Sequence, residues 1–189
     1  MIKGITFDLD GVYFPGSCKQ KFMDEVAKLG VEPDEVKRVY LKSDEMNYQY
    51  KLGKMSDDQY WTWAAKEWGI DKSPEELISM VIDAYETNSE VAETVREARH
   101  NGYKTLICTN NFPARMNGLQ EKFGFLDDFD VVISSHQVGE PKPTKEIFKA
   151  LVKASGLAPN EIVFADDNEG SLAGAHEIGI QTFVYEDFD

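Results

Sequence analysis

Five short apolar segments divide this sequence unevenly, and their spacing restricts the folds open to the chain. They are residues 2–7, 105–108, 131–134, 162–165 and 181–185. Each has the length and apolar character of a buried strand, and helical patterns separate them from the second segment onward. Strands that alternate with helices form a parallel sheet covered by helices. We therefore predict an α/β protein with a Rossmann-like parallel sheet core flanked by helices.

The long interval between the first two predicted strands reads as helical. Its helices are expected from Lys19 to Leu29, from Pro33 to about Tyr50, after Ser56-Asp57-Asp58 and after Ser73-Pro74-Glu75-Glu76. A simple strand-helix-strand crossover needs far less chain than this. We expect an inserted all-helical subdomain at residues 16–86, with the core formed by residues 1–15 and 87–189.

The insertion is rich in aromatic residues, among them Tyr60, Trp61 and Trp68 at helical spacing. Such spacing is typical of the buried face of a small helical bundle. No repeat or Ser/Gly-rich linker interrupts the chain, so the insertion is expected to dock on the core.

Two carboxylates follow the first predicted strand, in the run Ile5-Thr6-Phe7-Asp8-Leu9-Asp10-Gly11-Val12. A strand with a period of two would point Asp8 and Asp10 to the same side, where their repulsion favours a cation or reactive ligand between them. Gly11 would let the chain turn and approach a ligand closely. The alternative interpretation is a strand that ends in an ordinary Asx-type turn.

Polar residues also follow two later strands and one loop. Thr109 and Asn110 end the second strand just before a helix expected at Pro113, although Thr and Asn also serve as ordinary helix caps. Lys142 lies between two prolines that stiffen the loop. This could hold its ammonium group at a fixed point to meet a phosphate, and the alternative is a solvent-facing lysine in a rigid turn.

The fourth strand ends in Asp166 and Asp167. Ligands of open parallel sheets bind beyond the carboxyl ends of the strands, so these carboxylates can converge there with Asp8 and Asp10. Converging carboxylates favour a hard cation, and Mg²⁺ fits best. His100, His136 and His176 show no metal-ligand spacing.

Composition excludes several classes of protein. The net charge of −14 argues against nucleic-acid binding, and no apolar run approaches the roughly 18 residues of a membrane span. The N-terminal residues lack a signal-peptide pattern, so a cytoplasmic protein is expected. Cys18 and Cys108 form no disulfide or zinc pattern, and both are expected to be reduced, with Cys108 buried.

In this order the four polar segments resemble the haloacid dehalogenase (HAD) superfamily. Its phosphatases carry DxDG(V/T), a strand ending in Thr or Ser, Lys-Pro, and a strand ending in Asp-Asp. The resemblance implies that Asp8 is the nucleophile and Asp10 the general acid/base. It implies phosphate contacts from Thr109, Asn110 and Lys142, and a Mg²⁺ site formed by Asp8, Asp10, Asp166 and Asp167. The insertion is similar to the family's helical cap.

The resemblance implies Mg²⁺-dependent hydrolysis of a small phosphorylated metabolite through an aspartyl-phosphate. Dehalogenase members lack an acid at the position of Asp10, so Asp10 favours phosphoryl transfer. A phosphomutase would keep the same residues, and a non-catalytic binding or regulatory relative, or an acidic metal-storing domain, remains an alternative.

The sequence departs from the family pattern in two places. Residues 12–16 are apolar and aromatic where many members are polar, and Ser171 stands where Asn is frequent. Residues 13–18 and 48–63 are expected to shape the pocket for the leaving group.

Overall fold

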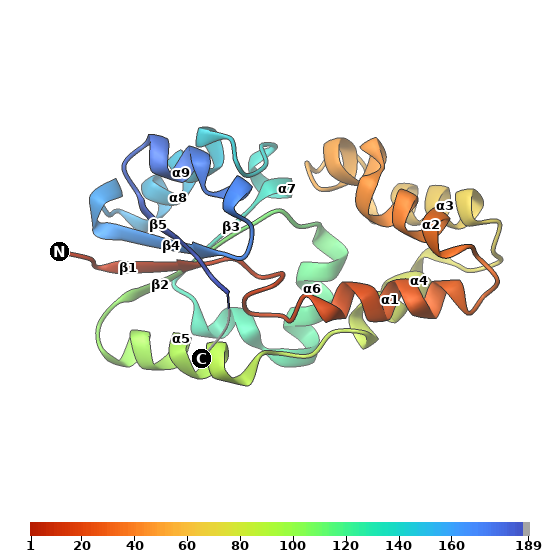
Figure 1. Ribbon diagram of the computed structural model, residues 1–189, viewed down its shortest axis with the longest axis horizontal. Helices are drawn as coiled ribbons and strands as arrows, with labels where there is room; N and C mark the ends of the chain where they lie inside the picture. Colours follow the sequence, from red (N-terminus) through yellow and green to blue (C-terminus); the bar gives the residue numbers. More distant parts are fainter. Residues whose placement is uncertain (187–189) are drawn as a thin grey trace.

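The computed structural model, which describes residues 1–186, contains one sheet of five parallel strands (Figure 1). The strand order is β3-β2-β1-β4-β5. The strands are β1 (Gly4–Phe7), β2 (Lys104–Thr109), β3 (Val131–Ser134), β4 (Ile162–Asp166) and β5 (Gln181–Val184). All five predicted strands are present, with ends that differ by one or two residues. The predicted α/β class is therefore confirmed.

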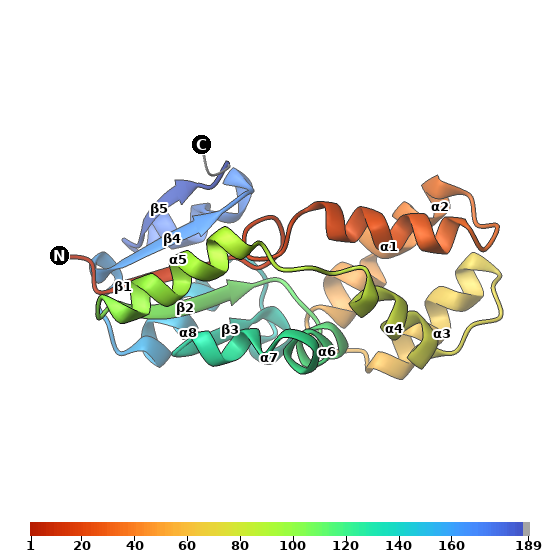
Figure 2. The same ribbon diagram turned by 90° about the horizontal axis from the view of Figure 1, so that it is seen from below.

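Helices cover both faces of the sheet (Figures 1 and 2). Helices α5 (Ser89–His100) and α6 (Pro113–Phe123) lie on one face, and α8 (Lys145–Ser155) and α9 (Ala173–Glu177) lie on the other. On β2, Ile107 belongs to the buried cluster on the α5 and α6 side, whereas Leu106 and Cys108 pack with Phe148 of α8. A strand buried on both faces explains why this segment is almost entirely apolar.

Four short elements complete the core. They are η3 (Phe125–Asp128), α7 (Ser135–Val138), η4 (Pro159–Glu161) and η5 (Glu169–Ser171).

Between β1 and α5 the chain is helical, and this segment lies beyond the carboxyl ends of the strands (Figures 1 and 2). Its elements are α1 (Ser17–Ala27), α2 (Pro33–Lys37), η1 (Arg38–Lys42), η2 (Glu45–Tyr50), α3 (Asp57–Trp68) and α4 (Pro74–Asp83). Capping boxes start α3 and α4, where Ser56 and Ser73 accept hydrogen bonds from the backbone N–H groups of Gln59 and Glu76. These two helix starts confirm the sequence-based predictions.

The single helix predicted from Pro33 to about Tyr50 is wrong. The chain leaves the helical conformation at Ser43, whose ψ angle is 149°. The Ser43 hydroxyl donates to Val39 O at 2.6 Å and accepts from Met46 N at 3.1 Å. One hydroxyl thus ends the first helical stretch and caps the second. Serine is unfavourable inside helices because its hydroxyl competes in this way with the backbone for hydrogen bonds.

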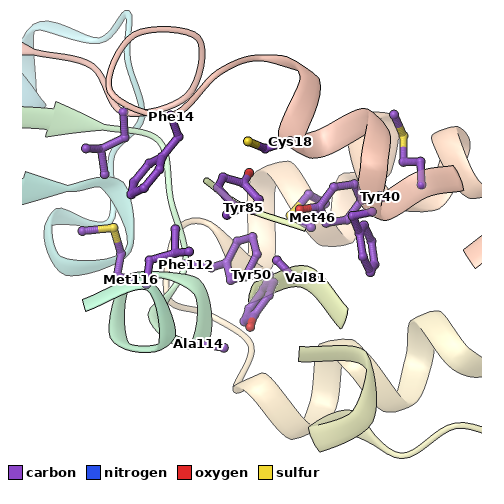
Figure 3. Close-up of a cluster of buried hydrophobic side chains, with 14 of the residues drawn as sticks. Phe14, Cys18, Tyr40, Met46, Tyr50, Val81, Tyr85, Phe112, Ala114 and Met116 are labelled. Atoms are coloured by element: carbon purple, nitrogen blue, oxygen red, sulfur yellow. The ribbon is translucent and has the colours of Figure 1, made fainter. Parts of the chain in front are cut away.

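The helical segment and the core share one buried aromatic cluster, part of which is drawn in Figure 3. Tyr50 stacks on Phe112 with ring centroids 4.6 Å apart, and Trp61 Nε1 donates to Tyr50 OH at 3.0 Å. Tyr60 and Trp68 are also buried, as the helical spacing predicted. The aromatic residues therefore hold the insertion against the core.

Two polar contacts add to this docking. Ala114 N, in the first turn of α6, donates to Asp57 Oδ1 at 3.2 Å. Ser135 Oγ donates to Lys51 O at 2.6 Å. Each contact joins a residue of the helical segment to the start of a helix in the core, so hydrogen bonds hold the segment to the core at two points.

Cys18 and Cys108 are both free and buried. Burial raises the pKa of the Cys108 thiol to about 12, which leaves it protonated and suited to packing. Among residues 1–186, no helix is both long and apolar enough to cross a bilayer.

Candidate active site

A pocket of about 270 Å³ opens at the carboxyl ends of β1, β2 and β4. All the residues predicted for the site line it, namely Asp8, Asp10, Thr109, Asn110, Lys142, Asp166 and Asp167. The strand register explains this convergence: Phe7 pairs with Ile107 on one side and with Ala165 on the other. The residues that follow these positions therefore emerge at one edge of the sheet.

Asp8, Lys142 and Asp166 form a buried charged cluster. Lys142 Nζ lies 2.8 Å from Asp8 Oδ1 and 2.6 Å from Asp166 Oδ2. Burial raises the pKa of Asp8, and the charges of Asp166 and Asp10 add to this, whereas Lys142 opposes it. Burial lowers the pKa of Lys142, but the two carboxylates outweigh it and raise that pKa overall. Lys142 is therefore held as a cation beside Asp8.

Three carboxylates approach closely enough to hold a metal ion. One oxygen each of Asp8, Asp166 and Asp167 lies within 4.8 Å of the others. Burial raises the pKa of Asp167, and the charge of Asp8 adds to this, as expected for neighbouring carboxylates. A set made only of carboxylate oxygens fits a hard divalent cation such as Mg²⁺.

Gly11 gives Asp167 room at this position. A Cβ atom on Gly11 would lie 1.9 Å from Asp167 Oδ2, and the φ angle of Gly11 is +90°. Only glycine combines this backbone conformation with such a close approach. Gly11, which follows β1, thus leaves space for the carboxylate of Asp167, which follows β4.

Thr109 places a free hydroxyl in the pocket. The residue is buried, and its Oγ1 atom has no hydrogen-bond partner among the described residues. A buried hydroxyl without a partner is uncommon in folded proteins, and a bound oxyanion would satisfy it.

The side chain of Asn110 pairs with the backbone of Lys142. Lys142 N donates to Asn110 Oδ1 at 2.7 Å, and Asn110 Nδ2 donates to Lys142 O at 3.0 Å. From the other side, Gly174 allows a close approach of this loop, because a Cβ there would lie 2.0 Å from Pro143 O. Asn110 therefore positions Lys142, and a phosphate contact from its side chain stays a prediction.

Asp10 lines the same pocket, but its carboxylate is bound to a separate group of residues. Arg115 Nη2 lies 2.6 Å from Asp10 Oδ2, and Lys19 Nζ lies 3.2 Å from the same oxygen. Tyr85 OH donates to Asp10 Oδ1 at 2.9 Å and accepts from Arg115 Nη1 at 2.6 Å. Asp10 is not one of the three clustered carboxylates, so its predicted place in the metal site stays a prediction.

These contacts determine the charge of Asp10. Burial alone would raise its pKa, but Arg115, Lys19 and the Tyr85 hydroxyl together bring that pKa well below its ordinary value. Asp10 is therefore an anion in this arrangement.

Sequence reasoning did not single out several residues around the pocket. Lys19 and Lys51 come from the helical segment, Tyr85 follows α4, and Arg115 lies in the first turn of α6. Arg115 is only 2% exposed, and its guanidinium packs over the Phe112 ring at 4.8 Å. The short sequence separation between Arg115 and Thr109 was the one signal that could have placed this arginine near the pocket.

Few residues of the predicted leaving-group segments line this pocket. None of residues 13–18 does, and Tyr13 and Phe14 are buried against Phe125. Of residues 48–63, Lys51 lines this pocket, and Tyr48 and Lys51 line a neighbouring one. Ser171, the residue that departs from the family pattern, lines the pocket at the carboxyl ends of the strands together with Asn168.

Comparisons with known proteins agree with this architecture. A family model described as haloacid dehalogenase-like hydrolase matches residues 2–179. The chain is 27% identical over 191 residues to the (S)-2-haloacid dehalogenase of Pseudomonas sp. (strain YL), covering 96% of this chain and 81% of that protein. It is 25% identical to the D-ribitol-5-phosphate phosphatase of Bacteroides thetaiotaomicron, covering 98% of this chain and 93% of that protein.

A solved structure shares the fold. A HAD family enzyme from Bacteroides thetaiotaomicron, in complex with magnesium and inorganic phosphate, superposes with a TM-score of 0.84 at 20% identity. The match covers 98% of this chain and 95% of that one.

Proposed function

This chain belongs to the haloacid dehalogenase-like hydrolase family, and from that premise we propose that it is a Mg²⁺-dependent phosphatase acting on small phosphate monoesters through a phosphorylated Asp8. The observation that carries the proposal is the presence of a second carboxylate, Asp10, in the same pocket as Asp8. Phosphoryl transfer needs a proton donor for the leaving alkoxide, whereas the release of halide from carbon does not. The relatives at 25–27% identity include both a phosphatase and a dehalogenase, so this residue favours the phosphatase.

Asp8 is the proposed nucleophile. One of its oxygens would attack phosphorus while the bond to the leaving oxygen breaks, giving an aspartyl-phosphate and an alkoxide. Lys142 and the free Thr109 hydroxyl support binding of the phosphoryl oxygens. In a protein with a net charge of −14, such local donors are needed to hold an anionic group.

Asp8, Asp166 and Asp167 would hold Mg²⁺. When bound, the ion supplies positive charge that neutralises the phosphoryl oxygens during transfer. The side chains of Asp166 and Lys142 meanwhile keep Asp8 in place through the ion pairs on either side of Lys142.

Asp10 is the proposed general acid and base. Because Asp10 is an anion before substrate binds, it would first take up a proton as the substrate enters and then give that proton to the departing alkoxide. As an anion again, it would take a proton from the water that attacks the phosphorus of phospho-Asp8, releasing inorganic phosphate. Its contacts with Arg115 and Tyr85 favour the anion, which is the form needed for the second step. Such a group contributes about 10²–10⁴ to the rate.

The helical segment at residues 16–86 is the proposed cap. It lies over the carboxyl ends of the strands and contributes Lys19 and Lys51 to the pocket. A cap in this position would exclude bulk water during the first step, so that the leaving group is protonated before hydrolysis begins.

The test is phosphate release from a panel of small phosphate esters, with and without Mg²⁺. The native protein is expected to release phosphate only with Mg²⁺. Asp8→Asn should abolish release, and Asp10→Asn should reduce it by about 10² or more. 2-Chloropropionate in the same panel should yield no halide.

Other outcomes would redirect the assignment. Transfer of the phosphoryl group to a second substrate, without inorganic phosphate, would indicate a phosphomutase. Halide release, or phosphate release that survives Asp8→Asn, would contradict the proposal.

A further inference from the structure

Lys51 brings its amino group to the pocket from the helical segment. It follows η2 directly, and it lines both the main pocket and a neighbouring pocket of about 280 Å³. Asn110 and Lys142 are also shared by the two pockets. The second pocket therefore adjoins the pocket in which Asp8 is proposed to meet a phosphoryl group.

Among residues 1–186, no carboxylate lies within ion-pair distance of Lys51, although the charges of Asp10 and Asp8 act on it from farther away. Lys19 pairs with Asp10, and Lys142 pairs with Asp8 and Asp166. Within the described part of the chain, Lys51 Nζ forms no ion pair shorter than 4.0 Å, and its hydrogen bond is to the neutral Asn47 Oδ1 at 3.2 Å. Burial, helped by the charges of Lys19 and Arg115 and opposed by those of Asp10 and Asp8, lowers the pKa of Lys51 to about 7.

The position of Lys51 is constrained on two sides. Its carbonyl accepts a hydrogen bond from Ser135 Oγ at 2.6 Å. Asn47, which accepts from the ammonium group, donates through Nδ2 to Leu41 O at 2.9 Å and to Ser43 O at 3.1 Å. The break in the helix at Ser43 thus provides the carbonyl that orients Asn47 toward Lys51.

The second pocket is small and mixed in character. The helical segment contributes Asn47, Tyr48 and Lys51, and the loop on the opposite side contributes Pro141 and Pro143. Sites for drug-sized ligands begin at about 300 Å³. A pocket slightly below this size, lined by a lysine that no described carboxylate pairs with directly, fits a short leaving group that ends in an anion.

We propose that Lys51 determines substrate specificity by binding a second anionic group, a carboxylate or a phosphate, on the leaving group of the ester. This proposal rests on the proposed phosphatase function and names its substrate class: short phosphorylated acids or bisphosphates. A bound anion would pair directly with Lys51 Nζ and favour its protonated form, and burial from water strengthens such a pair.

The experiment compares three probes that differ at one end of a three-carbon chain. These are glycerol 3-phosphate, 3-phosphoglycerate and glycerol 1,3-bisphosphate. In the native protein, at least one anionic probe should have a higher kcat/KM than glycerol 3-phosphate, and the better of the two identifies the anion as carboxylate or phosphate.

Lys51→Met should lower kcat/KM for the preferred anionic probe at least tenfold more than for glycerol 3-phosphate, mainly through KM. Lys51→Arg, which keeps the charge, should restore most of the preference. Lys54→Met is the matched control, because Lys54 is an exposed lysine of the same segment and should leave the ratio between probes unchanged.

Equal losses for all three probes would overturn the proposal, since Lys51 would then act on the transferred phosphoryl group. No loss for any of the three probes would overturn it as well. Calorimetry with Mg²⁺ then measures binding of the probes to the Asp8→Asn protein, with and without Lys51→Met. Because binding needs no turnover, this measurement tests the inference separately from the proposed function. A preference for the anionic probes that depends on Lys51 supports the inference even if the native protein proves inactive, and its absence contradicts it.

Discussion

Asp10 and Arg115, which lie 105 positions apart in the chain, form a buried ion pair with Arg115 Nη2 2.6 Å from Asp10 Oδ2. Tyr85 joins the pair through its hydroxyl, donating to Asp10 and accepting from Arg115. The three residues come from the end of β1, from α6 and from the return of the helical segment to the core. The proposed acid/base residue therefore sits where the sheet, the core helix and the proposed cap meet.

Arg115→Met should destabilise the protein strongly, because it leaves the carboxylate of Asp10 without its buried partner. Breaking a buried ion pair from one side costs roughly 3–5 kcal/mol, measured here as the free energy of unfolding in urea. Arg96→Met is the control, because Arg96 is 56% exposed and lies 3.5 Å from Asp128 in a surface pair. That pair should contribute at most about 1 kcal/mol. Equal losses in the two variants would contradict the structural role given to Arg115.

Gly11→Ala should weaken Mg²⁺ binding, because the added Cβ meets the Asp167 carboxylate and the φ angle of +90° disfavours alanine. Displacing a group that supports a metal site typically costs about 10–100-fold in affinity. The measurement is the Mg²⁺ concentration that gives half-maximal phosphate release, supported by calorimetric titration with Mg²⁺. Gly16→Ala is the matched control, since a Cβ there meets nothing within 4 Å. Unchanged Mg²⁺ affinity in Gly11→Ala would argue against a metal site at Asp167.

Asn110→Ala should weaken phosphate binding by releasing Lys142, since the side chain of Asn110 makes two hydrogen bonds to the Lys142 backbone. If Asn110 acts only through Lys142, its effect on binding of inorganic phosphate should be smaller in a Lys142→Met background than in the native protein. Calorimetry on the four proteins of this double-mutant cycle measures the coupling. Fully additive effects would instead indicate a direct contact between Asn110 and phosphate.

Lys51 should make stability depend on pH above neutrality. Its pKa is about 7 in the folded protein and about 10.4 in an unfolded chain. Between these values the unfolded chain binds a proton that the folded chain lacks, so the free energy of unfolding rises with pH, by at most about 1.4 kcal/mol per pH unit.

The comparison with Lys51→Met isolates this effect. The native protein should gain stability relative to Lys51→Met as the pH rises from 7 to 9, and below pH 7 the difference should be constant. Urea unfolding without Mg²⁺ or phosphate measures it, and Lys54→Met should follow the native curve. Parallel curves for the native and Lys51→Met proteins would show that Lys51 keeps an ordinary pKa.

The strands, most of the helices and the gathering of seven predicted residues around one pocket could be predicted from the sequence, because their signals are local. Apolar runs mark the strands, and Ser56 and Ser73 begin helices through contacts three residues away. The parallel topology then brings the ends of β1, β2 and β4 to one edge whatever the details of packing. This is why the order of the strands along the chain is enough to assign Asp8, Thr109 and Asp166 to one site.

The tertiary structure alone decided which groups each of these residues touches. Asp10 faces Arg115 and Tyr85 rather than the other carboxylates, Asn110 turns to the backbone of Lys142, and Ser43 divides a segment that reads as one helix. The helical segment also brings Lys51 into the pocket, where no described carboxylate pairs with it. These arrangements depend on contacts between residues far apart in the chain or on competition between hydrogen bonds of similar strength. A periodic pattern records which face of an element is buried, but it does not record which partner packing places opposite a given side chain.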